Sequence, residues 1–156
     1  MNKLRLILGD QLNINHSWFK ENNSKITYVM MEVKEETSYV LHHAQKIIAT
    51  FAAMRFFAEQ LQQKGFEVIY FKINDKQNKQ SFYQNINKTI KEKNIGELQY
   101  LEPDEYRLST ELKKLESIEN IKVESVDTEH FLVPKLYAKD FFSEKKHWRM
   151  EEFYRN

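Results

Sequence analysis

The chain has 156 residues, of which 41% are hydrophobic and 13% aromatic, a composition that suits one globular domain with a substantial core. The 24 lysines and arginines nearly balance the 23 aspartates and glutamates, so the net charge of +1 supplies no global field for binding nucleic acid or an anionic membrane. The absence of cysteine excludes a disulfide framework and a thiolate-ligated metal or iron–sulfur site within these residues. The N-terminal sequence MNKLRLILGDQLN lacks a secretory signal, and no segment approaches the roughly 20 apolar residues of a membrane span, so we expect a cytoplasmic protein.

Five short apolar runs are spaced along the chain and predict strands. They lie at residues 4–8, 26–33, 66–73, 97–103 and 121–127. Strands that are apolar along most of their length are typical of a sheet that helices cover on both faces.

Helical patterns lie between these runs. Between the second and third strands, apolar residues from Val40 to Leu61 recur at three- and four-residue steps, which predicts one long amphipathic helix. We expect Ser38 to be its N-cap and Gly65 to mark its end. Two further helices are predicted at 78–94 and 109–117. The alternation indicates an α/β fold, a Rossmann-like three-layer sandwich with a five-stranded, mostly parallel sheet.

The pattern changes after Phe131. Residues 132–156 interleave aromatic residues with basic ones, including Lys145, Lys146 and Trp148, which is one signature of single-stranded nucleic acid binding. Acidic residues dilute that signal, so an amphipathic segment that docks on a neighbouring domain is the favoured interpretation. We therefore divide the chain into a Rossmann-like domain at 1–130 and an extension at 131–156.

Candidate ligand-binding residues follow the strands, because ligands of open α/β sheets settle beyond the carboxyl ends of the strands. These positions are Gly9 to Leu12, Glu32 to Glu36, Asn74 and Asp75, Glu102 to Arg107, and Asp127 to His130.

The turn Gly9-Asp10-Gln11-Leu12 allows two interpretations. Gly9 permits a turn and Asp10 caps the next segment, or Gly9 lets a flat ligand approach the backbone while Asp10 and Gln11 offer hydrogen-bonding groups. Neither the dinucleotide fingerprint nor the Walker loop is present. An acidic residue at this turn argues against a pyrophosphate and favours a ligand with hydroxyls or ring N–H groups.

Three other groups of residues carry side chains that could bind a ligand or a metal ion. Glu36 and Tyr39 lie three apart, so they either face the same crevice as Asp10 or form a solvated helix start. His42 and His43, taken as adjacent helical residues, point about 100° apart and do not predict a metal site. The stretch EPDEYRL at 102–108 is explained by a strand end at which Arg107 pairs locally.

Four stretches together resemble the N-terminal domain of photolyase-related proteins, in the bacterial iron–sulfur branch of the photolyase/cryptochrome family. They are LRLILGDQLN, EVKEETSYVLHHAQKIIATFAAMRFFAEQL, LEPDEYRL and WRMEEFYR. The resemblance implies a longer parent protein whose helical C-terminal domain binds FAD, a 4Fe-4S cluster and damaged DNA. Members of this branch repair (6-4) photoproducts or act as blue-light receptors, and this chain would be their antenna domain, not catalytic alone, with the FAD domain as its partner.

The resemblance also implies a chromophore and its site. The chromophore is 6,7-dimethyl-8-ribityllumazine, which carries ring N–H groups and hydroxyls but no phosphate. Its contacts would fall on Gly9, Asp10, Gln11, Leu12, Val33, Glu36 and Tyr39. Two alternatives stay open: a stand-alone nucleotide-binding enzyme on the same fold, and a protein-interaction module whose aromatic-basic tail docks a partner.

Overall fold

The computed structural model describes residues 1–131, 133, 135–144, 147 and 149–155. The chain divides into two compact units, Met1–Val126 and Asp127–Asn156. Lys145, Lys146 and Trp148, which contribute to the basic-aromatic pattern of the tail, lie outside the described residues.

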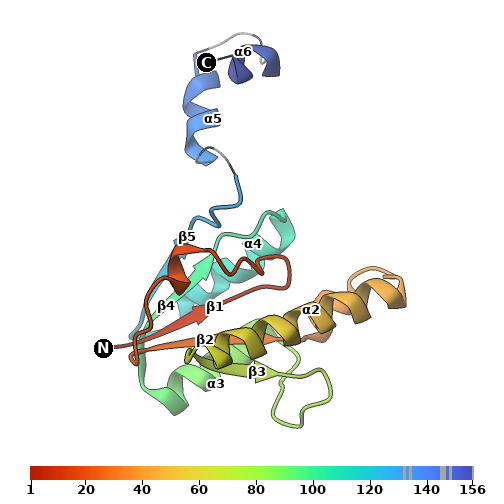
Figure 1. Ribbon diagram of the computed structural model, residues 1–156, viewed down its shortest axis with the longest axis vertical. Helices are drawn as coiled ribbons and strands as arrows, with labels where there is room; N and C mark the ends of the chain where they lie inside the picture. The colour runs from red at the N-terminus through yellow and green to blue at the C-terminus, as the bar shows by residue number, and fades with distance from the viewer. Residues whose placement is uncertain (132, 134, 145–146, 148, 156) are drawn as a thin grey trace. The chain divides into compact units, whose positions relative to one another are not determined.

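The first unit is built on a five-stranded sheet, drawn in Figure 1. Its strands are β1 (Asn2–Leu6), β2 (Ile26–Met31), β3 (Glu67–Phe71), β4 (Ile95–Leu101) and β5 (Lys122–Val126). They are ordered β3-β2-β1-β4-β5, and each neighbouring pair is parallel. The predicted α/β, Rossmann-like fold is confirmed, with a sheet that is parallel throughout.

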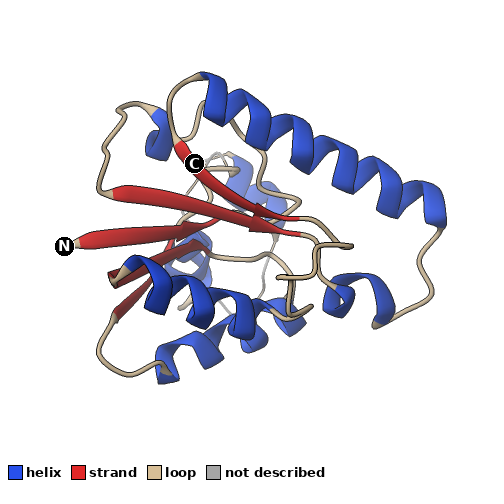
Figure 2. Ribbon diagram, turned by 90° about the horizontal axis from the view of Figure 1, so that it is seen from below, coloured by secondary structure: helices blue, strands red, loops and turns tan. Residues whose placement is uncertain are grey.

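Helices cover both faces of this sheet, as Figure 2 shows. The long helix α2 (Ala44–Gln63) and the short helix η1 (Ser17–Phe19) lie on one face, whereas α3 (Phe82–Lys93), α4 (Tyr106–Lys113) and η2 (Lys114–Ser117) lie on the other. Alternate residues of each strand serve the two layers, because successive side chains of a strand point to opposite faces. Leu4 and Leu6 of β1 pack with Ile86 of α3, while Ile7 packs with Leu61 of α2.

The long helix predicted after β2 is confirmed as α2, but it begins at Ala44 and not near Ser38. The segment forms a five-residue helix α1 (Lys34–Ser38), a turn, and then α2, whose N-cap is His43. Ser38 is therefore the last residue of α1 and not a cap. Its hydroxyl donates to the carbonyl of Lys34 at 2.7 Å, a local bond of the kind by which serine competes with regular helix.

The helix after β4 also begins earlier than predicted. It starts at Tyr106, so the Ser109-Thr110 pair lies inside the helix, and the Thr110 hydroxyl donates to the carbonyl of Tyr106 at 3.0 Å. The predicted stop of α2 at Gly65 is confirmed. Gly65 has φ of 85°, and the Phe66 N–H closes the helix end on the carbonyl of Leu61 at 3.0 Å.

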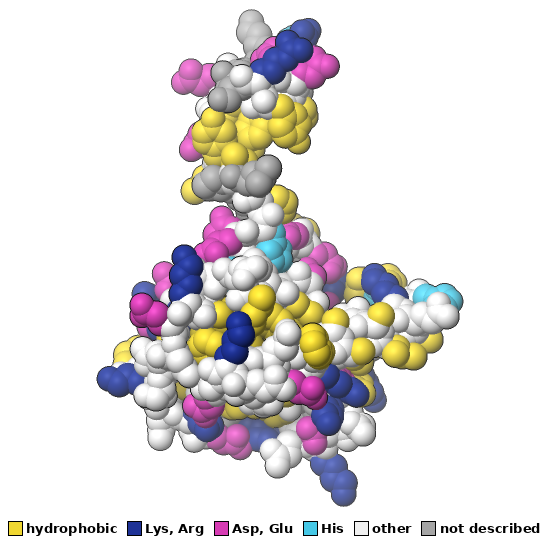
Figure 3. Space-filling model, in the orientation of Figure 1, with side chains coloured by type: hydrophobic (Ala, Val, Ile, Leu, Met, Phe, Trp, Pro, Cys, Tyr) yellow, Lys and Arg dark blue, Asp and Glu magenta, His cyan; other side chains and the backbone are white. Residues whose placement is uncertain are grey.

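The second unit contains two helices, α5 (Lys135–Phe142) and α6 (Met150–Tyr154). The ring of Phe153 in α6 lies 5.3 Å from that of Phe141 and 5.7 Å from that of Phe142, centroid to centroid. Apolar side chains gather around these helices in Figure 3. In the part of the chain that the structure describes, no helix is long and apolar enough to cross a membrane.

Candidate functional site

A cavity of about 260 Å³ lies at the carboxyl end of the sheet. Three groups of residues form its walls. They are Leu8, Gly9, Asp10, Met31 and Val33 at and beyond the ends of β1 and β2; Glu36, Thr37, Tyr39 and His42 from α1 and the turn after it; and Lys46, Ile47, Thr50, Phe51, Met54, Phe82, Glu105 and Leu108 from α2, α3 and the start of α4. The lining is mostly apolar, with carboxylates at one side.

This position follows from the topology of the sheet. From β1 the chain builds outward to β2 and β3, and then crosses to the other side of β1 to form β4 and β5. The strand order therefore reverses beside β1, and in open α/β sheets the ligand crevice lies at such a reversal. Gly9 and Asp10 follow β1 directly, which brings them to the cavity.

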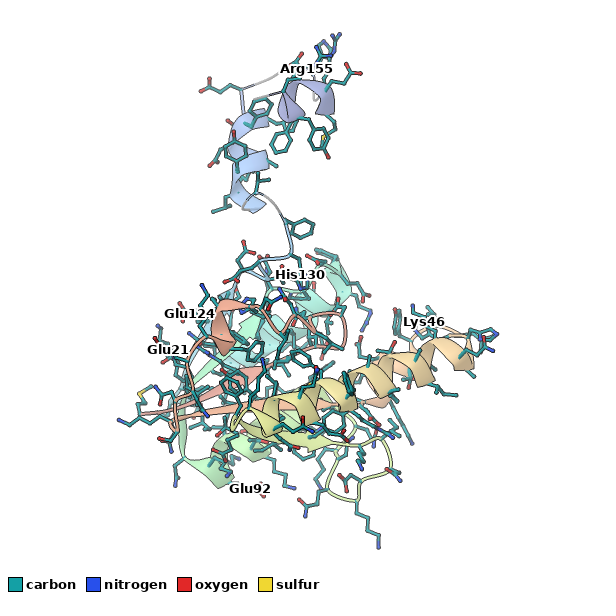
Figure 4. The ribbon with its side chains drawn as sticks, in the orientation of Figure 1. Glu21, Lys46, Glu92, Glu124, His130 and Arg155 are labelled. Atoms are coloured by element: carbon teal, nitrogen blue, oxygen red, sulfur yellow. The ribbon has the colours of Figure 1, made fainter. Side chains whose placement is uncertain are left out.

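Helix α2 forms one wall of the cavity, and none of its residues was predicted as a site residue from the sequence. The N-terminal end of the helix runs past the ends of the strands, as Figure 2 shows, and Lys46 lies near that free end in Figure 4. Lys46, Thr50 and Met54 are spaced by four residues and line the cavity together. This four-residue spacing is visible in the sequence, but the same spacing is typical of a helix face that packs on the core.

Arg107 organises the rim of the cavity. Its guanidinium donates to Glu36 at 3.0 Å and to Glu105 at 2.8 Å, and it lies 3.8 Å from the centroid of the Tyr39 ring. The local pairing expected for Arg107 is therefore joined by a contact with α1. The ring of His42 meets Tyr39 edge to face at 5.0 Å.

Burial and the charged residues around Glu36 shift the pKa of its carboxyl group. Burial raises its pKa above the ordinary value, Arg107 opposes that rise, and the nearby carboxylates of Glu105 and Asp10 add to it. The side chain of Glu36 thus stands between a cation and two anions. It is suited to accept a hydrogen bond from an N–H or hydroxyl group.

Gly9 lies close against α2. A Cβ built at Gly9 would approach the Met54 sulfur to 3.0 Å and the Thr50 methyl to 3.1 Å. The missing side chain therefore preserves space in the cavity, as the interpretation of Gly9 as a close-approach position requires.

Five of the seven predicted contact residues come together at the cavity: Gly9, Asp10, Val33, Glu36 and Tyr39. Gln11 and Leu12 do not line it. Gln11 is 2% exposed, accepts from the Leu8 N–H at 3.1 Å and donates to the carbonyl of Leu101 at 3.2 Å, so it fixes the turn from inside. Leu12 packs against the core on the α2 face.

Glu32 is turned away from the cavity into a buried network. It is 0% exposed and accepts two bonds from Arg55, at 2.6 and 2.8 Å, one from the Tyr70 hydroxyl at 2.7 Å and one from the Ile73 N–H at 2.8 Å. Burial by itself raises the pKa of Glu32, but these four donors outweigh it and hold the pKa below its ordinary value. Glu32 therefore joins β2 to α2 and β3.

The remaining strand-end candidates lie elsewhere. Asn74 and Asp75 are in the β3–α3 loop and do not line the cavity, and Asp127 to His130 belong to the second unit. Within the described residues, no group of three or more His, Asp or Glu side chains is arranged to hold a metal ion. His42 and His43 lie outside any helix, contrary to prediction, and the Nδ1 atom of His43 accepts from the Gln45 N–H at 3.2 Å.

The lining of the cavity combines an apolar surface with three carboxylates, Asp10, Glu36 and Glu105, and one cation, Lys46. The cavity volume lies just below the roughly 300–1,000 Å³ typical of small-molecule sites, which suits one ring system better than a dinucleotide. Asp10, Glu36 and Glu105 offer acceptors where a phosphate would need donors.

Comparisons with known proteins give two matches that cover nearly the whole chain. The family model described as deoxyribodipyrimidine photo-lyase-related protein matches residues 5–156. A (6-4) photolyase from Agrobacterium fabrum (strain C58 / ATCC 33970) is 35% identical over 156 residues, covering 99% of this chain. The chain spans 31% of the length of that relative. With a match that runs over nearly its whole length, the chain belongs to the family of deoxyribodipyrimidine photo-lyase-related proteins.

Proposed function

We propose that the first unit, Met1–Val126, is the antenna domain of a photolyase-related protein and binds 6,7-dimethyl-8-ribityllumazine at the cavity. The observation that carries the proposal is the meeting of Asp10 and Glu36, from two separate segments, in one apolar cavity at the carboxyl end of the sheet. The lumazine has one ring N–H group and ribityl hydroxyls that match these acceptors, and no phosphate to be repelled by them.

The residues present fit such a ligand. Asp10 and Glu36 would accept hydrogen bonds from it, and Phe51, Met54 and Tyr39 would pack on a flat ring. When bound, the lumazine would absorb near-ultraviolet to blue light and pass the excitation to a flavin. The protein's own part is to hold the ring in one orientation and keep water away from it, which needs no nucleophile and no proton transfer.

The proposal also assigns a place to the FAD, the iron–sulfur cluster and the DNA contact of a photolyase. The curated (6-4) photolyase is much longer than this chain, which spans 31% of it. We assign the FAD, the 4Fe-4S cluster and contact with damaged DNA to the remainder of such a longer protein. A FAD-binding domain is then the partner toward which residues 131–156 lead.

The test is retention of the chromophore. The purified chain is incubated with the lumazine and passed through gel filtration, and absorbance in the near-ultraviolet to blue is measured in the protein peak. Asp10→Ala or Glu36→Gln should raise the dissociation constant roughly ten- to a hundredfold, because each removes a charged acceptor worth roughly 1.5–3 kcal/mol.

Glu21→Gln is the matched control. Glu21 is an exposed carboxylate that lies far from Lys46 in Figure 4, so its substitution should leave retention unchanged. Equal and weak retention by the wild type and both cavity variants would refute the antenna assignment. Calorimetry with ATP and Mg²⁺ gives the contrasting outcome, since tight binding there would favour a nucleotide-binding enzyme.

A further inference from the structure

The β3–α3 loop, residues 72–81, contains a residue in an unfavourable backbone conformation. Gln80 has φ of 61°, in the left-handed region that favours glycine and tolerates asparagine. Asn94 and Asn120 adopt the same region, with φ of 50° and 64°, and they are the residue type that does so readily. A glutamine there points to surrounding contacts that hold it and to a role for the side chain.

Three hydrogen bonds hold Gln80. Its N–H donates to the Asn78 side chain at 2.8 Å, its side-chain amide donates to the carbonyl of Ile73 at 2.8 Å, and its side-chain oxygen accepts from the Lys34 N–H at 3.2 Å. Lys34 is the first residue of α1. The Gln80 side chain therefore bridges its own loop and the start of the helix that carries Glu36.

The loop is itself anchored in the core. Asn78 is buried and donates to the carbonyls of Glu32 at 2.7 Å and Lys72 at 3.0 Å. The fully buried Asn85 of α3 donates to the Asn78 oxygen at 2.9 Å and accepts from the Lys79 N–H at 2.8 Å. Because these amides are buried and paired, the loop is a fixed support.

Helix α1 needs such a support. It has five residues, well below the length at which a helix is stable by itself in water. A second tie from the same region reinforces the first, since the Phe82 N–H donates to the Glu35 carboxylate at 3.1 Å. Both ties end on α1 within two residues of Glu36.

We propose that Gln80 is a positioning residue for the cavity: through Lys34 it holds α1 so that Glu36 and Tyr39 face the ligand. Gln80 does not line the cavity and would not touch the ligand. The inference rests on the proposed function for the identity of the ligand, but the clamp on α1 is a property of the free protein.

The experiment compares Gln80→Gly with Asn120→Gly. Both substitutions place glycine at a left-handed position and relieve a backbone cost, which is larger for glutamine than for asparagine, but only the first removes the bridge to Lys34. Hydrogen exchange is measured at the amides of residues 36–38 without ligand. It should be about tenfold faster in Gln80→Gly and unchanged in Asn120→Gly.

The second measurement is the dissociation constant for the lumazine. It should rise about tenfold in Gln80→Gly and stay unchanged in Asn120→Gly, while the midpoint of thermal unfolding is not lowered in either. Equal exchange at residues 36–38 in both variants overturns the clamp. Faster exchange with unchanged affinity overturns the link between the clamp and the site.

These outcomes separate the two proposals. A wild type that does not bind the lumazine refutes the antenna assignment, whereas the exchange measurement tests the clamp without any ligand. Should Gln80→Gly fail to fold, Gln80→Asn replaces it, because asparagine tolerates the left-handed conformation and its side chain is too short for the bridge. The same exchange difference is then expected, and its absence overturns the clamp.

Discussion

Gly9 lines the cavity and has no side chain, and a Cβ at this position would crowd α2. Gly9→Ala places a methyl group about 3 Å from the Met54 sulfur and the Thr50 methyl, so the flexible methionine, which lines the cavity, must shift. We expect the free energy of unfolding to change by less than about 1 kcal/mol and the dissociation constant for the lumazine to rise about tenfold. Thermal unfolding and equilibrium binding measure the two effects.

A second substitution checks the cause. Thr50→Ala removes one of the two close contacts and suits a helix, so Gly9→Ala combined with Thr50→Ala should regain part of the lost affinity. No loss of affinity in Gly9→Ala would show that the space beside Gly9 is not used by the ligand.

Glu32 makes the stability of the fold depend on pH. Its pKa in the folded protein lies below the ordinary value, so its contribution is fully present above the pKa of the unfolded chain and is lost as the pH falls through the folded pKa. Glu32→Gln should cost about 1.5–3 kcal/mol at pH 7, because the buried carboxylate loses its charge-assisted hydrogen bonds, whereas the partly exposed Arg55 keeps its hydration. The difference from wild type should shrink as the pH falls from about 5, the region in which the unfolded chain takes up the proton.

Denaturant unfolding across this pH range measures the effect. Glu67→Gln is the control, because Glu67 also has a lowered pKa but pairs with Lys93 at the surface, where an ion pair contributes about 0–1 kcal/mol. If the two variants lost stability equally at pH 7, the buried network would not be the source.

At the scale of elements, the break between α1 and α2 decides where the cavity wall begins. His43 caps α2 through its ring nitrogen, and histidine is not among the strong N-cap residues. His43→Asp should raise the free energy of unfolding by about 0.5–1 kcal/mol, because aspartate caps better and its charge favours the helix N-terminus. Thermal unfolding measures the gain.

Ser38→Ala is the contrasting variant. If Ser38 were the N-cap of a single long helix, its loss would cost about 1 kcal/mol. Because Ser38 closes α1, we expect a change below about 0.5 kcal/mol. A larger loss in Ser38→Ala than in His43→Ala would contradict the observed break.

The sequence predicted the elements better than their boundaries. The strands were evident because a parallel strand buried on both faces is apolar along its length. The break after Ser38 was not evident, because the apolar spacing continues through the turn. The contacts that mark the break are local: the Ser38 hydroxyl donates to the Lys34 carbonyl, and the His43 ring nitrogen accepts from the Gln45 N–H. Side-chain periodicity carries no record of such local bonds.

At the scale of the whole molecule, the edge that holds the cavity was predictable, but the direction of each side chain was not. Asp10 and Gln11 are neighbours in one turn, yet Asp10 lines the cavity and Gln11 holds Leu8 and Leu101. Glu32 likewise precedes Val33, and only Val33 lines the cavity. Which residue of a strand end faces the cavity depends on the alternation of the chain and on distant partners such as Arg55.

The end of α2 that runs beyond the sheet reflects a difference in length. The 20 residues of the helix extend about 30 Å, whereas the six residues of β2 extend only about 20 Å. About two turns of helix therefore have no strand beneath them, and Lys46, Ile47 and Thr50 come from those turns. The cavity thus forms where α2, being longer than β2, extends past the carboxyl end of the sheet.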